Sequence, residues 1–399
     1  MNTPNIRFKG YTDAWEQRKV GDLAEVNPKS AIPDEFEYVD LESVVGTEII
    51  AHRTESRESA PSRAQRLATA GDVFYQTVRP YQKNNCLFEG ADESYVFSTG
   101  YAQLRPVGDS YFLLTMLQRD DFVNEVLDRC TGTSYPAINA NVLADLSVSC
   151  PARLQEQEKI GRHFKNLDNL ITLHQRKCDD LQEVKKYMLQ KLFPQNGAKI
   201  PEIRFEGFTG DWEQCRLIEG CDYVDYRGKT PIKTEDGIFL VTAKNVKDGY
   251  IDYETSQEYI AEEDYDDVMH RGMPQIGDVL ITTEAPCGNV AQVDRENIAL
   301  AQRIIKYRGH ENQIDNTYLK HYLLTPYFQG VLESKSSGGT VQGIKGSILH
   351  QQLIRHPSFE EQVKIGRHLD SIDNLIALHQ RKLEKLQALK KAYLSEMFV

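Results

Sequence analysis

The sequence predicts a mixed α/β (α+β) fold: duplicated globular modules, joined by two long α-helices that pack as an antiparallel coiled coil with pseudo-twofold symmetry. Three observations predict it. Two segments of the chain occur twice, one of them has coiled-coil spacing, and the regions between the copies alternate strand-like with helix-like runs. With 399 residues, the chain is long enough for more than one domain.

The duplicated segments set the domain order. Residues 6–17, IRFKGYTDAWEQ, return at 203–214 as IRFEGFTGDWEQ with eight of twelve positions identical. A longer segment, 156–193, returns at 361–398 with 22 of 38 positions identical. The predicted order is a first module at 1–151, a long helix at 152–197, a second module at 198–356 and a second long helix at 357–399.

Apolar residues in the longer segment are spaced alternately by four and three, which is the heptad pattern of a coiled coil. A helix from 160 to 192 would be ~50 Å long at ~1.5 Å per residue. The predicted seam comprises Ile160, Phe164, Leu167, Ile171, His174 and Leu181, and in the second copy Ile365, Leu369, Ile372, Ile376, His379 and Leu386. Further apolar residues beside the seam predict another binding surface; they are Leu170, Leu173, Leu375 and Leu378.

The histidines on these helices favour a structural role. His163 and His174 are eleven residues apart, which is ~16 Å along a helix and beyond the reach of one metal ion. We therefore expect polar seam residues that set the helix register, and no metal site. We also find no catalytic motif, so any catalysis is expected to come from partners.

Between the copies, each module has its own sequence apart from short echoes. GDVFYQT at 71–77 is similar to GDVLITT at 277–283, and GTSYPAI at 132–138 is similar to GTVQGI at 339–344. Apolar, β-rich runs such as these alternate with helix-like runs such as 111–128. We therefore expect each module to be a separate mixed α/β unit.

Charge and cysteine content restrict the class of protein. The net charge is −12, and the acid lies on the modules, with a net −8 over residues 1–150 and −9 over 201–355. The seven cysteines form no C-x-x-C pair, which favours reduced thiols in a cytoplasmic protein. No apolar run is long enough to span a membrane, so no membrane association is expected.

Polar loops of both modules carry side chains suited to DNA. Arginine can donate two hydrogen bonds to guanine, amides can pair with adenine, and hydroxyl groups can contact phosphates. A solvated loop is the alternative for each residue. The candidates are Arg53, Arg57, Arg63, Arg66, Arg79, Tyr81, Lys83, Ser134 and Tyr135 in the first module, and Lys244, Asn245, Lys247, Thr282, Thr283, Lys335, Thr340, Gln342 and Lys345 in the second.

The order of variable module, EQ-x-KIG-R-x(5)-D-x-LI-x-LHQRK helix, second module and second copy resembles the specificity (S) subunit of type I restriction-modification systems. The resemblance covers essentially the whole chain. It implies two target recognition domains, each reading one half of a split target in double-stranded DNA, and helices that dock two modification (methyltransferase) subunits. It implies no cofactor in this chain; S-adenosylmethionine, ATP and Mg would be used by the modification and restriction subunits.

Helix length adds a geometric expectation. Two modules on one face of DNA should be separated by whole helical turns of ~34 to 36 Å, and a ~50 Å rod permits one turn. We therefore expect half-sites about 10 bp apart, centre to centre. Two rival hypotheses remain at this point: a non-enzymatic coiled-coil adaptor whose modules bind proteins, and an enzyme fused to a dimerising helix.

Overall fold

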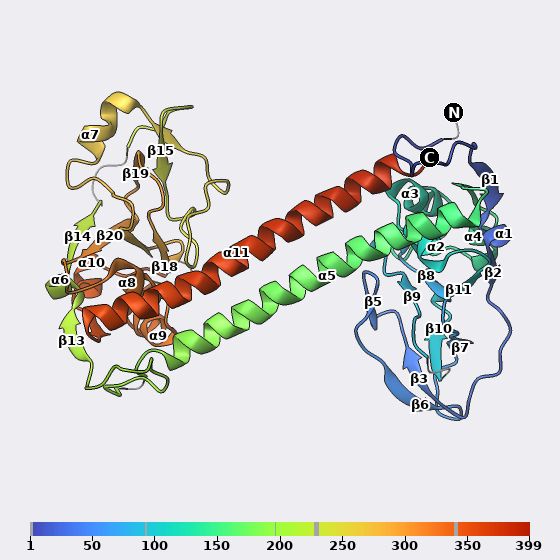
Figure 1. The fold of residues 1–399 in the computed structure, drawn as a ribbon, viewed down its shortest axis with the longest axis horizontal. Coiled ribbons are helices and arrows are strands. Elements are labelled where there is room, and N and C mark those ends of the chain that lie inside the picture. The colour runs from blue at the N-terminus through green and yellow to red at the C-terminus, as the bar shows by residue number, and fades with distance from the viewer. Residues whose placement is uncertain (1–2, 92–93, 196, 227–230, 339–341) are drawn as a thin grey trace. The chain divides into compact units, whose positions relative to one another are not determined.

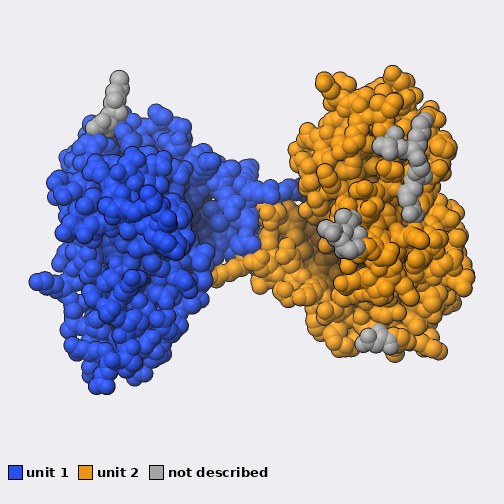
Figure 2. All heavy atoms as spheres, turned by 180° about the vertical axis from the view of Figure 1, so that it is seen from behind, with its two compact units in different colours: residues 1–175, 381–399 blue, residues 176–380 orange. Residues whose placement is uncertain are grey.

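The structure is a computed structural model that describes residues 3–91, 94–195, 197–226, 231–338 and 342–399. The chain forms two compact units, coloured separately in Figure 2. Unit 1 contains residues 1–175 and 381–399, and unit 2 contains residues 176–380. This division differs from the expected four segments, because each unit takes part of both long helices.

Unit 1 is built on two four-stranded sheets (Figure 1). In the first sheet β10 pairs parallel with β3 and antiparallel with β7, and β3 pairs antiparallel with β6. Its order is β6 (Arg53–Ser56), β3 (Glu35–Val39), β10 (Tyr95–Ser98) and β7 (Ala64–Leu67). The second sheet is antiparallel, in the order β2 (Ala24–Val26), β11 (Tyr101–Pro106), β8 (Val73–Gln76) and β9 (Cys86–Leu87).

Unit 2 repeats this plan with different residues. Its antiparallel sheet has the order β14 (Cys221–Asp225), β20 (Ile304–Gly309), β17 (Val279–Thr283) and β18 (Cys287–Gln292). The other sheet has the order β16 (Tyr259–Ile260), β15 (Ile238–Val241) and β19 (Ile298–Leu300), and β15 pairs parallel with β19. Two modules of dissimilar sequence therefore share a similar plan, although the mixed sheet has four strands in unit 1 and three in unit 2.

Short elements complete each unit. In unit 1, β1 (Glu16–Lys19) and β12 (Ser147–Cys150) form a two-stranded antiparallel sheet. In unit 2, β13 (Glu213–Arg216) and β21 (Leu353–His356) form the equivalent sheet. Unit 1 also has a short pair of β4 (Val44–Val45) with β5 (Glu48–Ile49). The helices of unit 1 are α1 (Val20–Leu23), η1 (Pro80–Gln82), α2 (Ser110–Leu117), α3 (Asp120–Asp128) and α4 (Ala140–Ala144). Those of unit 2 are α6 (Leu217–Gly220), η2 (Glu262–Asp264), α7 (Tyr265–Val268), α8 (Asn316–Leu323), α9 (Pro326–Lys335) and α10 (Gly346–Leu349).

The long helices are α5 (Leu154–Lys191) and α11 (Phe359–Glu396), each of 38 residues. Within unit 1 the Lys390 ammonium lies 2.5 Å from the Asp168 carboxylate, so the first half of α5 packs beside the last half of α11. Within unit 2 Lys185 and Asp373 form the equivalent ion pair at 2.6 Å. The helices therefore run antiparallel, and the predicted mixed α/β fold with two long helices is confirmed.

The seam residues near the N-terminus of each long helix pack against the module as well as against the other helix. Ile160, Phe164 and Leu167 belong to the hydrophobic core of unit 1, and Ile365, Leu369 and Ile372 belong to that of unit 2. Leu386 packs at the edge of the first core, and Leu181 and Ile376 pack at the edge of the second. Ile171, His174 and His379 are half-buried. The heptad stripe is thus partly a module core.

The copied residues connect each helix to its module. Arg7 donates two hydrogen bonds to Glu156, at 2.6 and 2.9 Å, and Arg204 binds Glu361 in the same way at 2.8 and 2.8 Å. Both glutamates are only 1 % exposed, so each buried charge is compensated by a paired guanidinium. A side chain at Gly161 would collide with the Asp109 carboxylate that caps α2, which explains the glycine of the KIG motif.

The two tryptophans mark where the far ends of the long helices are buried. Trp15 contacts Phe398 just beyond α11, with ring centroids 5.8 Å apart. Trp212 contacts Phe193 just beyond α5 at 6.2 Å. Each unit therefore holds the start of one copied segment and the end of the other. Among the described residues, no helix is both long and apolar enough to cross a membrane.

Phe398→Ala is expected to destabilise unit 1 by about 3–5 kcal/mol, because the ring is buried between Trp15, Phe112 and Phe164. Hydrogen exchange measured by mass spectrometry should increase in unit 1 and not in unit 2. The matched variant Phe193→Ala should show the opposite distribution. Equal changes in both units for either variant would contradict this assignment of the helix ends.

Candidate nucleic-acid interface

The echoed motifs of the two modules come together at one strand end in each unit. In unit 1 the Ile138 amide donates to the Thr77 carbonyl at 3.0 Å, which joins the GTSYPAI loop to the segment after β8. In unit 2 the Ile344 amide donates to the Thr283 carbonyl at 2.9 Å and joins the second GT loop to β17. The same backbone framework therefore presents different side chains in the two modules.

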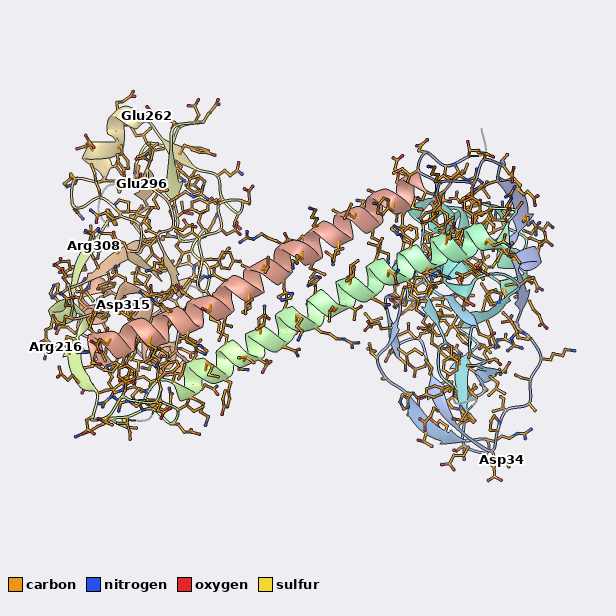
Figure 3. The ribbon with its side chains drawn as sticks, in the orientation of Figure 1. Asp34, Arg216, Glu262, Glu296, Arg308 and Asp315 are labelled. Atoms are coloured by element: carbon orange, nitrogen blue, oxygen red, sulfur yellow. The ribbon has the colours of Figure 1, made fainter. Side chains whose placement is uncertain are left out.

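An ion pair with a buried carboxylate lies at the opposite end of the same strand in each unit. Arg105 of β11 binds the Asp72 carboxylate with two hydrogen bonds of 2.9 Å, and Arg308 of β20, labelled in Figure 3, binds Asp278 at 2.6 and 2.8 Å. Both aspartates are 1 % exposed. They belong to the GD pair of the echoed motifs, and each follows a glycine with φ above +90°. The aspartate of this motif is structural.

The predicted DNA-contacting residues fall into distinct environments. Ten are exposed: Arg53, Arg57, Arg63, Tyr81, Ser134, Tyr135, Lys244, Lys335, Gln342 and Lys345. Four are half-buried: Arg66, Arg79, Lys83 and Lys247. Thr340 lies outside the described residues. Exposure leaves a role in DNA contact open for these residues and does not test it.

Three of the predicted cations in unit 1 contact carboxylates: Arg57 lies 3.9 Å from Asp34, and two others are paired more closely. Arg53 donates to Asp40 at 2.7 Å and to Glu55 at 2.8 Å. The Lys83 ammonium contacts Asp120 at 2.6 Å and also donates to a backbone carbonyl of the module. Binding a phosphate with either cation would require rearranging these contacts, so both are weaker candidates than the sequence indicated.

Three predicted contacts of unit 2 have buried side chains, which argues against their binding DNA directly. Asn245 is fully buried and donates to the backbone carbonyls of Asp252 and Ser256 at 2.8 and 2.9 Å. Thr282 and Thr283 are the last residues of the buried strand β17, and the Thr283 hydroxyl donates to a carbonyl inside the protein. These side chains hold loops and strands in place.

A hollow of about 370 Å³ lies at this strand end in unit 2. Among its lining residues, Thr283 and Lys345 were predicted DNA contacts, whereas Glu284, Gln302 and Arg303 were missed. Arg303 is exposed and lies 3.4 Å from Glu284. The available signal was the polar pair Gln302–Arg303 immediately before the apolar run of β20. At the corresponding strand end of unit 1, Arg79 and Tyr135 lie together, with the guanidinium 4.2 Å from the ring centre.

A polar cluster lies where α8 packs on α11 in unit 2. The His321 ring nitrogen Nε2 is 2.9 Å from Asp370, and Lys320 contacts the same carboxylate at 2.5 Å. Asp373 is paired with Lys185. His321, Asp370 and Asp373 are close enough to share a metal ion, but the two ammonium groups on these carboxylates compete with a cation. Burial lowers the pKa of His321 to about 4.

Comparisons with known proteins identify the class. The sequence model of the type I restriction modification DNA specificity domain matches residues 12–183 and again 210–388. The chain is 25% identical over 297 residues to the type I restriction enzyme MjaVIII specificity subunit of Methanocaldococcus jannaschii, covering 71% of this chain and 68% of that one. It is 22% identical over 341 residues to the putative MjaX specificity subunit of the same organism, covering 80% and 76%.

A solved structure has the same fold. The crystal structure of the type I restriction-modification system S subunit from M. genitalium is similar to this chain with a TM-score of 0.67, at 15% identity, covering 100% of this chain and 99% of that one. Because the family model matches both halves, the chain belongs to the type I restriction modification DNA specificity domain family. Membership of this family supports a role in DNA recognition. It does not support the alternative hypothesis of a coiled-coil adaptor whose modules bind proteins.

The His321 cluster predicts a pH dependence of stability. The folded pKa of about 4 lies below the ordinary value of 6.5, so the unfolded state binds the proton more readily between these values. The free energy of unfolding of unit 2 should therefore fall as pH is lowered from 6.5 to 4. A Trp15→Phe background leaves Trp212 as the fluorescent reporter of unit 2 during urea unfolding.

Adding His321→Gln to the Trp15→Phe background should remove most of the fall in the free energy of unfolding between pH 6.5 and 4. Unit 1 is the control, followed through Trp15 in a separate Trp212→Phe background, because Thr115 lies six residues after the cap Asp109, as His321 does after Asp315. An unchanged pH profile in the His321→Gln variant would contradict the prediction.

Proposed function

We propose that this chain is the DNA-reading subunit of a type I restriction-modification complex, in which each module reads one half of a split target in the major groove of double-stranded DNA. The observation that carries this proposal is the family match to both halves of the chain. The shared strand-end framework supports it, since one scaffold presents different polar residues in the two units. Two half-sites of different sequence require such a difference.

The acidity of the chain is compatible with this role. A DNA-binding protein gains much of its affinity from phosphate contacts, and a net charge of −12 provides few of them. We propose that partner subunits supply most phosphate contacts, while a few clustered cations of this chain select bases. The acidic segments of unit 2, such as those that contain Glu262 and Glu296, both labelled in Figure 3, would lie away from DNA.

The partners we propose are two modification (methyltransferase) subunits, with restriction subunits as further members of the complex. Their docking surface would be the exposed apolar residues of the long helices. In unit 1 these are Leu170, Leu173 and Leu389, and in unit 2 they are Leu375, Leu378 and Val184. The two sets occupy equivalent positions of the copied segments, so each unit offers the same surface to an identical partner.

In this proposal the chain is non-catalytic and cytoplasmic. Methyl transfer from S-adenosylmethionine to adenine, and Mg- and ATP-dependent translocation and cleavage, would take place in the partner subunits. This division of labour fits a duplicated scaffold, because two copies of one partner require two equivalent sites. The rival enzyme fused to a dimerising helix would instead require activity from the isolated chain.

A map of adenine methylation tests the proposal. Long-read sequencing of host DNA with and without this gene should reveal a split target that depends on the gene, with half-sites about 10 bp apart, centre to centre. Replacing residues 1–150 by the module of another family member should change one half-site only. A contiguous target, or a simultaneous change in both half-sites, would refute independent reading by the two modules.

Charges on the exposed leucines should prevent partner docking. Leu170→Lys with Leu173→Lys in unit 1, or Leu375→Lys with Leu378→Lys in unit 2, should each reduce the complex to one methyltransferase subunit. Native mass spectrometry of the co-expressed proteins measures this stoichiometry. The control Gln190→Lys adds a charge at an exposed position of α5 on another side of the helix and should leave two subunits bound. Retention of both subunits in the leucine variants would exclude this surface.

A further inference from the structure

The segment that follows β8 in unit 1 has an unusual backbone. Arg79 adopts a left-handed conformation with φ 55° and ψ 54°, and Lys83, after the short helix η1, has φ 54° and ψ 30°. Residues other than glycine rarely adopt this conformation, and when they do it must be stabilised by surrounding contacts. Here the Arg79 amide donates to the Pro136 carbonyl of the GT loop at 2.7 Å. The strained turn is thus tied to the loop opposite it.

The Arg79 side chain is held by an aromatic ring instead of an acid. Its guanidinium lies 4.2 Å from the centre of the Tyr135 ring, which is 64% exposed. Among the described residues Arg79 forms no ion pair, whereas Arg53 is paired with two carboxylates. A stacked guanidinium keeps its planar set of N–H donors available while losing little additional side-chain freedom on binding.

Unit 2 provides an internal comparison. Arg79 lies two residues after Thr77, and Ala285 lies two residues after the equivalent Thr283. Ala285 also has a positive φ, of 50°. In both units proline comes next. The two turns share a positive φ before a proline but differ beyond it, because Pro80 opens the short helix η1 in unit 1 whereas the Ala285–Pro286 peptide bond of unit 2 is cis. The positive φ itself does not require arginine, so the arginine side chain is free to serve a purpose specific to unit 1.

We propose that Arg79 is a specificity-determining residue of unit 1, reading a guanine through paired hydrogen bonds to its O6 and N7 atoms, and that Tyr135 is the positioning residue that holds the guanidinium. This inference rests on the proposed function and deepens it. Guanine is the base whose major-groove edge presents two adjacent acceptors to the arginine fork. The half-site read by unit 1 then contains a guanine, and unit 2, with alanine at this place, recognises no base through it.

The test uses the full chain assembled with its methyltransferase subunits and a library of duplexes with randomised half-sites. Wild-type complex should select a guanine at one position of one half-site. Arg79→Ala should lose that selection, with about a 10- to 100-fold loss of discrimination there and no change in the other half-site. Arg79→Ala is expected to fold, because alanine already adopts a positive φ before the proline of unit 2, and circular dichroism and subunit stoichiometry check this.

Three further measurements separate the roles. Arg79→Lys keeps the charge and should still lose discrimination, because lysine lacks the planar fork. Tyr135→Phe should retain the guanine preference, whereas Tyr135→Ala should weaken it several-fold at the same position. Replacing that guanine by 7-deazaguanine removes the N7 acceptor, so it should weaken wild-type binding and have little effect on Arg79→Ala. Arg18→Ala removes an exposed arginine of β1 and controls for charge.

The outcomes distinguish this inference from the proposed function. A wild-type complex that selects no split sequence would overturn the proposed function. A wild-type complex that selects a split sequence, with Arg79→Ala keeping every base preference, would overturn only the role of Arg79. A uniform loss of affinity across all sequences in Arg79→Ala would assign Arg79 to a phosphate and also overturn the inference.

Discussion

The fold depends on burying the first half of each long helix in the core of a module. Phe164 and Leu369 are completely buried at equivalent places in the two units, and each unit contributes sheet, short helices and both long helices to one core. A long amphipathic helix exposed to water is marginal, so most of its stability must come from such packing. The same packing fixes which helix face is left for partners.

This constraint explains why some segments are near-copies while the modules differ. Glu156 and Glu361 are buried charges that need their arginine partners, and Gly161 needs to have no side chain where α5 meets α2. Changing any of these leaves an uncompensated charge or a steric clash. The loops at the strand ends carry no such requirement, since their backbone hydrogen bonds hold them irrespective of most side chains. Their residues can therefore vary with the DNA sequence to be read.

Much of the fold could be predicted from sequence, because repeats and heptads are local patterns. The helix bounds and the antiparallel pairing followed from the spacing of residues such as Ile160 and Leu369. The burial of these residues in module cores did not, because a heptad stripe does not reveal whether a helix or a sheet covers it. The order of the strands in each sheet depends on contacts between residues distant in the sequence, and hydrophobic periodicity does not reveal such contacts.

The candidate site was harder to predict, and the errors have a physical cause. Asn245, next to glycine-rich sequence, was interpreted as a loop residue exposed to DNA, but its amide satisfies backbone carbonyls inside unit 2. Thr282 and Thr283 continue the β-branched run of β17, and that strand pattern was the signal that they are buried. Arg79 was predicted as a loop candidate, but its left-handed turn and its contact with Tyr135 depend on tertiary structure.

The arginine–glutamate pairs that tie residues 6–17 and 203–214 to the helix starts have a consequence for how such proteins diversify. Arg7 and Arg204 each donate two guanidinium hydrogen bonds, and the Glu156 and Glu361 carboxylates accept them in the same way, so the two attachment points are equivalent. A module that is transferred by recombination together with its own short N-terminal segment finds a matching glutamate at either attachment point. New combinations of modules can therefore arise by gene exchange without any adaptation of the scaffold that receives them.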